Sequence, residues 1–489
     1  MERSEKIAFC QKMNFDLVII GGGITGAGIV RDASMRGLNC LLLEKSDFAS
    51  CTSSNSGKLI HGGLRYIRYL HFKTVFESCQ ERINLLKKVA PHLVKPVRFL
   101  IPFHKTSKTP KFLTMIGLFI YDLLSSFRNI SSFKVVAKNG PEIKELGPHF
   151  LKNGFKGAVT FYDCFVNDAR LTIESIKAAE AFKAINLNYC KVTKIENLAK
   201  LKWQVTVNDQ LTGESFIVKT STIISATGAW NDDVLGLNSK TYERFNMQLT
   251  SGAHLLIPKK RLQLNHTITV ESPINHRNIY FIPWDEMILV GTTDFYFEGD
   301  KDKIPLTKKH IDYLLNVINH FFPTANITEK DIESSYIGIR PLIGSTINQA
   351  IKIKEEKISR DYKIIFDPNG LLAISGGKLT TYRLMAQKCV DKLCREFFHK
   401  VKRADTLQKL PVPSNDLTYI IQNEYVEKLS DLLIRRIPFF YLDKNRDMEK
   451  LKEYAQIMGK IKQWDRTKEE AEINDYINET NLKLGRVSL

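Results

Sequence analysis

A chain of 489 residues is long enough for two or three domains with a large core. Its composition, 43% hydrophobic and 25% charged, excludes a disordered or fibrous protein. The net charge of +18 predicts anionic partners, such as a phosphorylated substrate or an acidic membrane surface, although a Lys- and Asn-rich proteome would also produce it. No nucleic-acid-binding motif accompanies the charge, so we expect no nucleic acid partner.

The cysteines and the hydropathy pattern indicate the cellular compartment and the absence of a membrane-spanning segment. The eight cysteines are scattered and form neither a C-x-x-C pair nor a Cys/His cluster, which predicts reduced thiols in a reducing compartment and no metal site. Residues 1–14 contain acidic residues and no apolar core, so we expect neither a signal peptide nor a transit peptide. No segment reaches the roughly 18 to 20 apolar residues that span a bilayer.

A glycine motif early in the chain predicts a dinucleotide site. An apolar run at 15–20 leads into Gly21, Gly23 and Gly26, which have G-x-G-x-x-G spacing, and a second apolar run ends on Glu44. The glycines permit a tight turn, a close approach of the backbone to a pyrophosphate and close helix packing. The helix N-terminus attracts phosphates, and the carboxylate can accept the ribose hydroxyls. The motif alone leaves NAD and FAD equally open.

The stretch 101–129 has the pattern of a membrane-surface segment, because basic residues flank an apolar centre at 112–124. This apolar length is too short to span a bilayer. It suits a helix lying in a membrane interface, with the lysines and Arg128 near lipid phosphates. The alternative is a core helix of a substrate domain. We expect a membrane-facing segment over 101–128.

The remaining periodicities predict alternating strands and helices. Helices are expected over 70–90, from Asp168, over 307–322 and from about Thr380, and β-structure over 186–224 and 245–297. The first β region runs into Ala226-Thr227-Gly228, a sequence that lets the backbone pass close to a bound cofactor. Residues 371–390 repeat the strand, glycine and helix pattern, which predicts a second helix N-terminus at the polar end of the cofactor ring.

Six stretches of the chain resemble one family, the FAD-dependent glycerol-3-phosphate dehydrogenases. They are TSSNSGKLIHGGLRY (52–66), YDCFVNDARL (162–171), SGAHLLIP (251–258), IPW to GTTD (282–294), YIGIRPL (336–342) and SGGKLTTYR (375–383). The resemblance implies an α/β fold with a Rossmann-like FAD-binding domain, an interleaved β-rich substrate domain and a short C-terminal helical domain. It also decides for FAD, because the loop after the ribose carboxylate continues toward a flavin.

The resemblance implies discontinuous domains. The FAD-binding domain is expected to comprise 1–75, 155–245 and 335–405, and the substrate domain 76–154 and 246–334. Residues 406–418 then form a linker, and 419–489 form a helical domain that is shorter than the family's own.

The family's activity is the oxidation of sn-glycerol 3-phosphate to dihydroxyacetone phosphate, with noncovalent FAD and membrane quinone as the electron acceptor. The resemblance thus implies a cytoplasmic protein held peripherally on an anionic inner membrane surface, and it allows a homodimer. Three alternatives stay open: a glycerol-3-phosphate oxidase that uses oxygen, an amine or amino-acid oxidase, and a flavin-binding scaffold. The short spacing between Pro341 and Leu371 favours the dehydrogenase over the oxidase.

Five residues in the matched motifs are the candidates for chemistry. Arg340 is the first choice for binding phosphate and Arg65 the second, because a guanidinium binds phosphate bidentately. His254 is the candidate base, Tyr66 is expected to position the substrate, and Lys378 to lie near the flavin. The resemblance also implies cofactor contacts for Thr52, Ser53, Lys58, His61, Val192, Ala226, Gly228, Gly377, Leu379 and Thr380.

Two positions depart from the family pattern. Gly57 stands where the family usually has a serine, which removes a hydroxyl that we expect near the flavin, and Asn167 replaces a carboxylate. Neither departure involves a residue proposed to bind the substrate.

Overall fold

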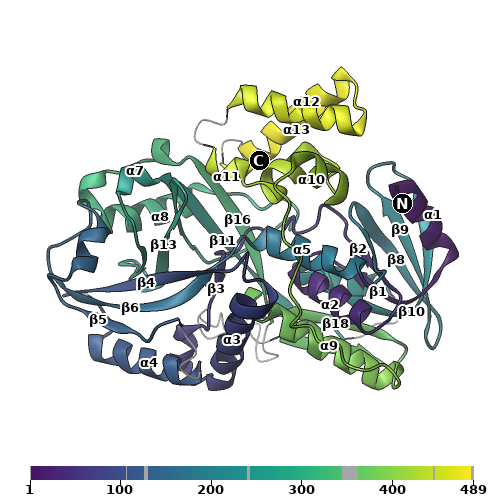
Figure 1. The fold of residues 1–489 in the computed structure, drawn as a ribbon, viewed down its shortest axis with the longest axis horizontal. Helices are drawn as coiled ribbons and strands as arrows, with labels where there is room; N and C mark the ends of the chain where they lie inside the picture. The colour runs from purple at the N-terminus through teal and green to yellow at the C-terminus, as the bar shows by residue number, and fades with distance from the viewer. Residues whose placement is uncertain are drawn as a thin grey trace.

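Two β-sheets lie side by side, and a group of C-terminal helices sits above their junction (Figure 1). This arrangement comes from a computed structural model, which describes residues 2–105, 107–125, 130–238, 243–343, 362–443 and 447–485. Arg128, expected near lipid phosphates, lies outside the described residues.

The first sheet carries the glycine motif. Its strand order is β17 (Tyr362–Asp367), β18 (Leu371–Gly376), β10 (Ser215–Ser225), β1 (Asn14–Ile20), β2 (Cys40–Leu43) and β7 (Ile185–Leu187), with β9 (Lys202–Asp209) on β10 and β8 (Cys190–Ala199) on β9. Strands β18 to β7 are parallel, and both faces are covered, which is why residues 17–20 of β1 are all apolar. Helices α2 (Ile24–Met35), α5 (Asp168–Glu180) and α9 (Tyr382–Phe397) pack together on one face. The β8–β9 hairpin and α1 (Arg3–Lys12) cover the other.

The second sheet is almost entirely antiparallel. Its order is β15 (Phe295–Tyr296), β11 (Met247–Pro258), β14 (Met287–Gly291), β13 (Asn278–Trp284), β12 (Thr267–Glu271), β4 (Lys95–His104), β6 (Phe155–Phe165) and β3 (Leu59–Ile60), with β16 (Ser334–Ile343) on β11 and β5 (Lys134–Val136) on β6. Helix α8 (Lys308–Phe321) packs on it through Leu314, Val317 and Ile318, which fall on one helical face.

Two helices pack against β4 and β6 of the second sheet, and the others are grouped at the C-terminus or are short. The first two are α3 (Phe72–Asn84), which continues as the π-helix η2 (Leu85–Val89), and α4 (Lys111–Leu124). The C-terminal group comprises α10 (Leu417–Asn423), η9 (Asp431–Arg436), α11 (Phe439–Leu442), α12 (Met448–Lys462) and α13 (Arg466–Lys483). The short helices are η1 (Leu64–Tyr69), η3 (Pro141–Leu146), η4 (Gly228–Trp230), α6 (Asn231–Gly236), α7 (Lys259–Leu262), η5 (Pro323–Ala325), η6 (Glu329–Asp331) and η8 (Leu379–Thr381).

The expected elements are present, but the sheets divide the chain differently from the expected domain boundaries. Strand β6 pairs with β3, β4 and β5, so residues 155–165 belong to the second sheet and not to the FAD-binding domain. Strand β16 likewise pairs with β11 along its whole length. Alternating apolar residues reveal a strand but not its partner, so the sequence does not show which sheet these two segments join.

The helices agree with their expected positions, and the cysteines are free thiols. The expected helix over 70–90 is α3 with η2, that from Asp168 is α5, and that over 307–322 is α8. Within the described ranges, no helix combines the length and apolar character required to cross a bilayer.

Candidate functional site

Two cavities meet at the junction of the sheets. The first lies at the carboxyl ends of β1, β2, β10 and β18, where open parallel sheets bind their ligands. The second lies against β11, β13, β14 and β16 of the second sheet. Thr52, Arg340, Gly377, Lys378 and Leu379 line both cavities. A ligand in the first cavity would therefore meet a ligand in the second at these residues.

The glycine motif closes the inner end of the first cavity. Gly21 has a φ of +109°, and a Cβ there would lie 2.7 Å from the carbonyl oxygen of Ala226. A Cβ on Gly26 would overlap the carbonyl oxygen of Gly21, so this glycine allows α2 to pack against the turn. Gly23 is the N-cap of α2 and lines the cavity. The motif thus has the close backbone approach that a pyrophosphate requires.

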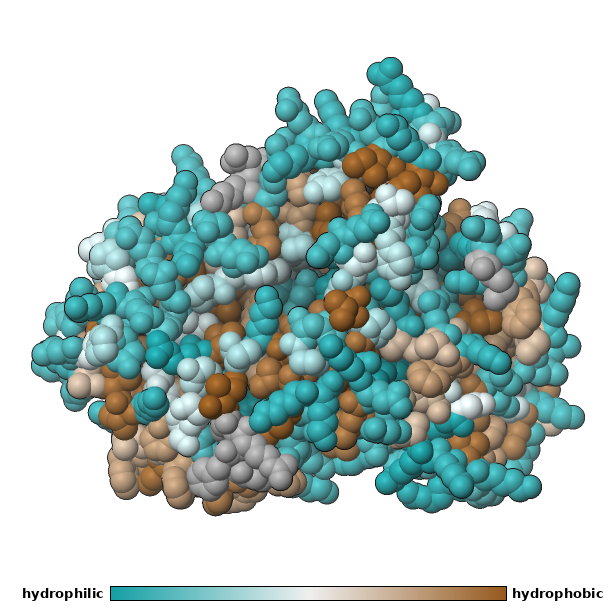
Figure 2. Space-filling model, viewed as in Figure 1, coloured by the Kyte–Doolittle hydropathy of each residue, from teal (hydrophilic) through white to brown (hydrophobic). Residues whose placement is uncertain are grey.

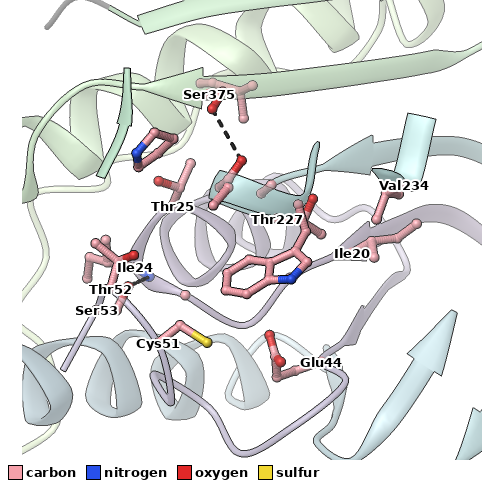
Figure 3. Close-up of a pocket in the computed structure, with 18 of the residues that line it drawn as sticks. Ile20, Ile24, Thr25, Glu44, Cys51, Thr52, Ser53, Thr227, Val234 and Ser375 are labelled. Atoms are coloured by element: carbon pink, nitrogen blue, oxygen red, sulfur yellow. Dashed lines mark hydrogen bonds between the residues drawn. The ribbon is translucent and has the colours of Figure 1, made fainter. Parts of the chain in front are cut away.

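Glu44 follows β2 and points into the first cavity (Figure 3). Its carboxylate accepts hydrogen bonds from the backbone N–H of Gly22 at 2.7 Å and of Ser46 at 2.9 Å. Burial raises the pKa of Glu44, and the two N–H donors oppose that effect. The backbone therefore holds a carboxylate in position to accept the hydroxyls of a ribose.

Ser53 brings the loop after Glu44 to the N-terminus of α2. Its hydroxyl accepts a hydrogen bond from the backbone N–H of Ile24 at 2.9 Å, and both residues line the first cavity (Figure 3). Unpaired N–H groups and the helix dipole at this end favour phosphate. The loop and the helix thus form one wall of an anion site.

Asn231 orders the opposite wall. Its side-chain oxygen accepts hydrogen bonds from the hydroxyls of Ser225 and Thr227, and its amide donates to the carbonyl of Ile374 at 2.7 Å. The strand end of β10 is thereby tied to β18, and Ala226, Gly228 and Val192 line the cavity beside it. The A-T-G sequence therefore lies where the backbone can pass close to a cofactor.

His254 lies in the second cavity, almost fully buried on β11. Its ring stacks on Tyr336 with the centroids 4.7 Å apart, and a Cβ on Gly291 of the neighbouring strand would overlap it. Burial lowers the pKa of His254 well below its usual range, and the charges of Arg340 and Lys58 lower it further. A neutral imidazole results, which can accept a proton.

Arg340 reaches across the same sheet from β16. Its Nη1 donates to the carbonyl of Thr293 at 3.2 Å and to Asp294 Oδ1 at 3.0 Å, and its Nη2 donates to Thr292 Oγ1 at 2.7 Å. A Cβ on Gly252 would overlap the guanidinium, so the glycine in the S-G-A-H sequence makes room for this side chain. Arg340 is thus held at the wall that the two cavities share.

Lys378 and Tyr66 form the opposite side of the junction. The Lys378 Nζ lies 3.9 Å from the centre of the Tyr66 ring and 3.3 Å from Ser78 Oγ on α3. Thr380 binds the backbone of His61 in both directions, accepting from its N–H at 3.0 Å and donating to its carbonyl at 3.1 Å. The two motifs that contain these residues are therefore adjacent in the fold although far apart in the chain.

Most of the predicted site residues line one of the two cavities. The first is lined by Gly21, Gly23, Glu44, Thr52, Ser53, Val192, Ala226, Gly228, Gly377, Lys378 and Leu379. The second is lined by His61, Arg65, Tyr66, His254, Arg340 and Thr380. Gly26 lines neither, because its part is to let α2 pack against the glycine turn.

Lys58 is placed differently from its prediction. It is almost fully buried and lines neither cavity. Its Nζ donates to Asp168 Oδ1 at 2.6 Å and to the carbonyl of Ser54 at 3.1 Å. The rings of Trp284, Tyr336 and Tyr441 surround it with their centroids 5.2 to 5.3 Å away. The structure thus gives Lys58 a packing role in place of the predicted flavin contact.

Several polar residues of the second cavity were missed. Arg277, Asn278 and Thr292 line it, and Asp294 bonds to two of its arginines without lining it. The matched G-T-T-D sequence after a strand was the available signal, because polar residues at a strand end often belong to a site. Arg277 had no such signal.

Comparisons with known proteins agree with this geometry. A family model described as FAD dependent oxidoreductase matches residues 16–383, and one described as C-terminal domain of alpha-glycerophosphate oxidase matches residues 383–469. The first cavity, with its glycine motif, and the adjoining second cavity are accordingly the site of a flavoprotein oxidoreductase.

Named relatives define the family more closely. The chain is 40% identical over 395 residues to an aerobic glycerol-3-phosphate dehydrogenase of Staphylococcus haemolyticus, covering 80% of this chain and 69% of the relative. It is also 40% identical over 383 residues to the protein of the same name from Staphylococcus aureus, covering 77% of this chain and 66% of that protein. The chain therefore belongs to the aerobic glycerol-3-phosphate dehydrogenase branch of the FAD-dependent oxidoreductase family. Its cofactor is FAD, which the glycine turn, Glu44 and the α2 N-terminus fit.

Solved structures share the fold. A Bacillus halodurans glycerol-3-phosphate dehydrogenase complexed with FAD superposes with a TM-score of 0.80 at 24% identity, covering 100% of this chain and 99% of that one. A Mycoplasma pneumoniae L-alpha-glycerophosphate oxidase with FAD bound has a TM-score of 0.61 at 19% identity and covers 82% and 100%. Dehydrogenase and oxidase thus share this architecture, so the fold does not distinguish their electron acceptors.

Proposed function

We propose that this protein oxidises sn-glycerol 3-phosphate to dihydroxyacetone phosphate. The observation that carries the proposal is the set of residues in the second cavity, where a neutral His254 lies among Arg65, Arg340 and Lys378. Three cations beside one base suit a small alcohol that carries a doubly charged phosphate. The names of the relatives support the same substrate.

The residues divide the reaction between them. Bound FAD supplies the two-electron acceptor for the C2 carbon of the substrate. Arg340 binds the phosphate, and Tyr66 of the second cavity and Lys378 of the shared wall hold the glycerol end. His254 takes the proton of the C2 hydroxyl on a ring nitrogen as the carbonyl forms. Atoms and charge balance, because C2 loses a hydride and its oxygen loses a proton.

Anaerobic reduction of the purified yellow protein tests this function. We expect sn-glycerol 3-phosphate to bleach the flavin absorbance, and glycine and sarcosine to leave it unchanged. Bleaching by an amine and not by the phosphorylated alcohol would overturn the proposal in favour of an amine oxidase. A yellow protein that neither class of substrate bleaches would favour a flavin-binding scaffold.

We further propose that the electrons pass to a membrane quinone, from a protein held at the cytoplasmic face of the membrane. The support is an exposed apolar face on α4, made of Phe112, Leu113, Ile116, Phe119 and Leu123, which are 40% to 69% exposed. Figure 2 shows hydrophobic colours gathered at the lower left, where Figure 1 places α4. Lys105 and Lys108 are exposed in the segment before the helix. An apolar helix face beside basic residues is typical of an interfacial helix.

The inner face of α4 links this surface to the site. The hydroxyl of Tyr121 accepts a hydrogen bond from the backbone N–H of Gly62 at 2.7 Å, one residue after His61. It also donates to Asp163 at 2.5 Å, and Arg82 of α3 donates to it at 2.8 Å. A membrane in contact with the outer face of α4 would therefore lie near the second cavity.

The electron acceptor has its own test. The protein reduced by sn-glycerol 3-phosphate is exposed to air in one sample and to a short-chain ubiquinone or menaquinone analogue without oxygen in another. We expect fast reoxidation by the quinone and slow reoxidation in air. Rapid formation of stoichiometric hydrogen peroxide would instead identify a glycerol-3-phosphate oxidase, with the substrate proposal unaffected.

A further inference from the structure

A buried carboxylate joins two arginines of the second cavity. Asp294 Oδ1 accepts a hydrogen bond from Arg340 Nη1 at 3.0 Å, and Asp294 Oδ2 accepts one from Arg277 Nη2. Both arginines line the cavity, whereas the Asp294 side chain is 1% exposed and does not. The two guanidiniums are thus held by opposite oxygens of one carboxylate.

Neighbouring strands of the second sheet bring these residues together. Arg277 immediately precedes β13, and Asp294 follows β14, which pairs with β13. Arg340 lies on β16, whose partner β11 pairs with β14 on its other edge. The three side chains therefore come from separate strands but share one region of the sheet. The contacts among the three side chains therefore depend on the register of the strands in this sheet.

The two arginines of the set present N–H donors that suit an anionic ligand. A buried carboxylate is costly unless it is paired, and two guanidiniums held this close repel each other unless an anion lies between them. Asp294 holds both guanidiniums, and both arginines line the cavity. Each guanidinium presents several N–H donors in a planar fork that matches the oxygens of a phosphate.

We propose that Arg277 is a second phosphate-binding residue, and that Asp294 is the positioning residue that fixes its spacing from Arg340. This inference rests on the proposed function, because it assigns the phosphate of the substrate to this end of the second cavity. Two guanidiniums at a fixed spacing would select a phosphorylated alcohol over the same alcohol without phosphate.

Substitution of Arg277 tests the binding role. We expect Arg277→Gln to lower kcat/KM for sn-glycerol 3-phosphate about 10- to 100-fold, since a charge-assisted bond contributes about 1.5 to 3 kcal/mol. The rate of flavin reduction by high concentrations of glycerol should stay unchanged, because glycerol has no phosphate. Arg277→Lys, which keeps the charge, should fall between the wild type and the glutamine variant. Equal losses with both substrates, or none with either, would overturn the proposal.

A matched control excludes a general effect of losing an ion-paired arginine. Arg261 donates through its Nε to Asp331 at 2.6 Å and lines neither cavity. Arg261→Gln should leave both substrates and the flavin content unchanged. A loss of selectivity in this control as large as that in Arg277→Gln would also overturn the assignment.

Asp294→Asn tests the positioning role, because asparagine keeps the shape and removes the charge. We expect a raised KM for sn-glycerol 3-phosphate with kcat little changed, and full flavin content in the absorbance spectrum. The double variant Asp294→Asn with Arg277→Gln should lose much less than the product of the single losses, because both act on one phosphate contact. Independent, multiplying losses would remove Asp294 from this role.

Inorganic phosphate separates this inference from the proposed function. Titration of the oxidised wild-type holoenzyme with phosphate should perturb the flavin spectrum, and Arg277→Gln should weaken that binding about tenfold or more. If sn-glycerol 3-phosphate fails to reduce the flavin but phosphate binding still depends on Arg277, only the substrate proposal falls. Phosphate binding that does not depend on Arg277 would overturn the inference itself.

Discussion

Burial makes His254 a base at ordinary pH. Its pKa lies well below the usual range because the ring is buried and Arg340 and Lys58 add positive charge nearby. Among the described residues, Nδ1 has no hydrogen-bond partner, and Nε2 lies where a Cβ on Gly57 would come within 3.6 Å. The low pKa keeps the imidazole neutral, and Gly57, beside Nε2, lines the second cavity together with His254.

We expect His254→Asn to lower kcat on the order of 10²- to 10⁴-fold with little change in KM, because it removes the proton acceptor and keeps the phosphate site. In the wild type, the acid limb of the kcat/KM profile should lie well below pH 6.5, since the depressed pKa keeps the base unprotonated there. Stopped-flow flavin reduction across pH measures both. His276→Asn, at a half-exposed histidine outside both cavities, is the control.

The lowered pKa of His254 also predicts how the stability of the protein depends on pH. His254 binds a proton readily in the unfolded chain but not in the folded one, so the free energy of unfolding should fall as the pH drops below about 6.5. His310, whose pKa burial lowers to about 4, acts in the same direction. Chemical denaturation at pH 7.5 and 5.5 measures the difference, and His310→Asn should reduce it.

Substitution of Gly57 should leave activity intact, whereas substitution of Gly252 or Gly291 should abolish or reduce it. Gly57 has ordinary backbone angles and room for a Cβ, so Gly57→Ser should keep activity and raise stability by about 0.4 to 1 kcal/mol by restricting the unfolded chain. Gly252→Ala and Gly291→Ala should lose activity, because the new methyl groups overlap Arg340 and His254. Denaturation midpoints and turnover measure the three variants. A Gly57→Ser protein without flavin would contradict this account.

At the scale of elements, the C-terminal domain holds the loop that follows the ribose carboxylate. Arg436 of η9 donates to both oxygens of Asp47 at 2.7 and 2.8 Å, and Arg435 donates to the same carboxylate. All three side chains are buried. Burial raises the pKa of Asp47, but Arg436 and Arg435 outweigh it and lower that pKa. The carboxylate therefore stays charged, three residues after Glu44.

We expect Arg436→Gln to cost about 3 to 5 kcal/mol of stability, because it leaves a buried carboxylate without its main partner. FAD should also dissociate faster, since the loop after Glu44 loses its anchor. Thermal unfolding and the fluorescence of released flavin measure the two effects. Lys450→Gln, which removes an exposed pair with Asp443 in the same domain, should change neither.

Sequence patterns predicted the elements better than their partners. The glycine motif, Glu44 and the motifs around His254 and Lys378 could be placed, because local spacing defines a turn or a strand end. The contact between Arg277 and Asp294 could not, because it depends on which strands pair. Lys58 was assigned to the flavin although its partner Asp168 lies 110 residues away in the chain. Periodicity carries no information on such pairs.

At the scale of the molecule, the net charge of +18 and the α4 face predict membrane binding that depends on salt. We expect Leu113→Ser with Phe119→Ser to weaken binding to vesicles containing anionic lipid about tenfold, a loss of about 1.4 kcal/mol. Raising the salt should weaken binding of the wild type. Sedimentation with vesicles of phosphatidylcholine and phosphatidylglycerol measures both.

A matched serine substitution controls for apolar loss elsewhere. Leu198 on β8 is 63% exposed, comparable to Leu113 at 56%, but lies in the first sheet far from α4 in the chain. Leu198→Ser should leave vesicle binding unchanged. If Leu198→Ser weakened binding as much as Leu113→Ser alone, binding would not depend on the α4 face.

The pairing of β10 with β18 has a consequence for synthesis of the protein. Ile223 and Leu371 are neighbours in the sheet but are separated by about 150 residues of chain. At roughly 5 to 20 residues per second, a ribosome needs on the order of ten to thirty seconds to make the second strand after the first. During that interval the emerging chain has its ribose carboxylate and glycine turn but lacks Lys378. The first cavity therefore has its full set of lining residues only after β18 and the Gly377–Leu379 segment have been made.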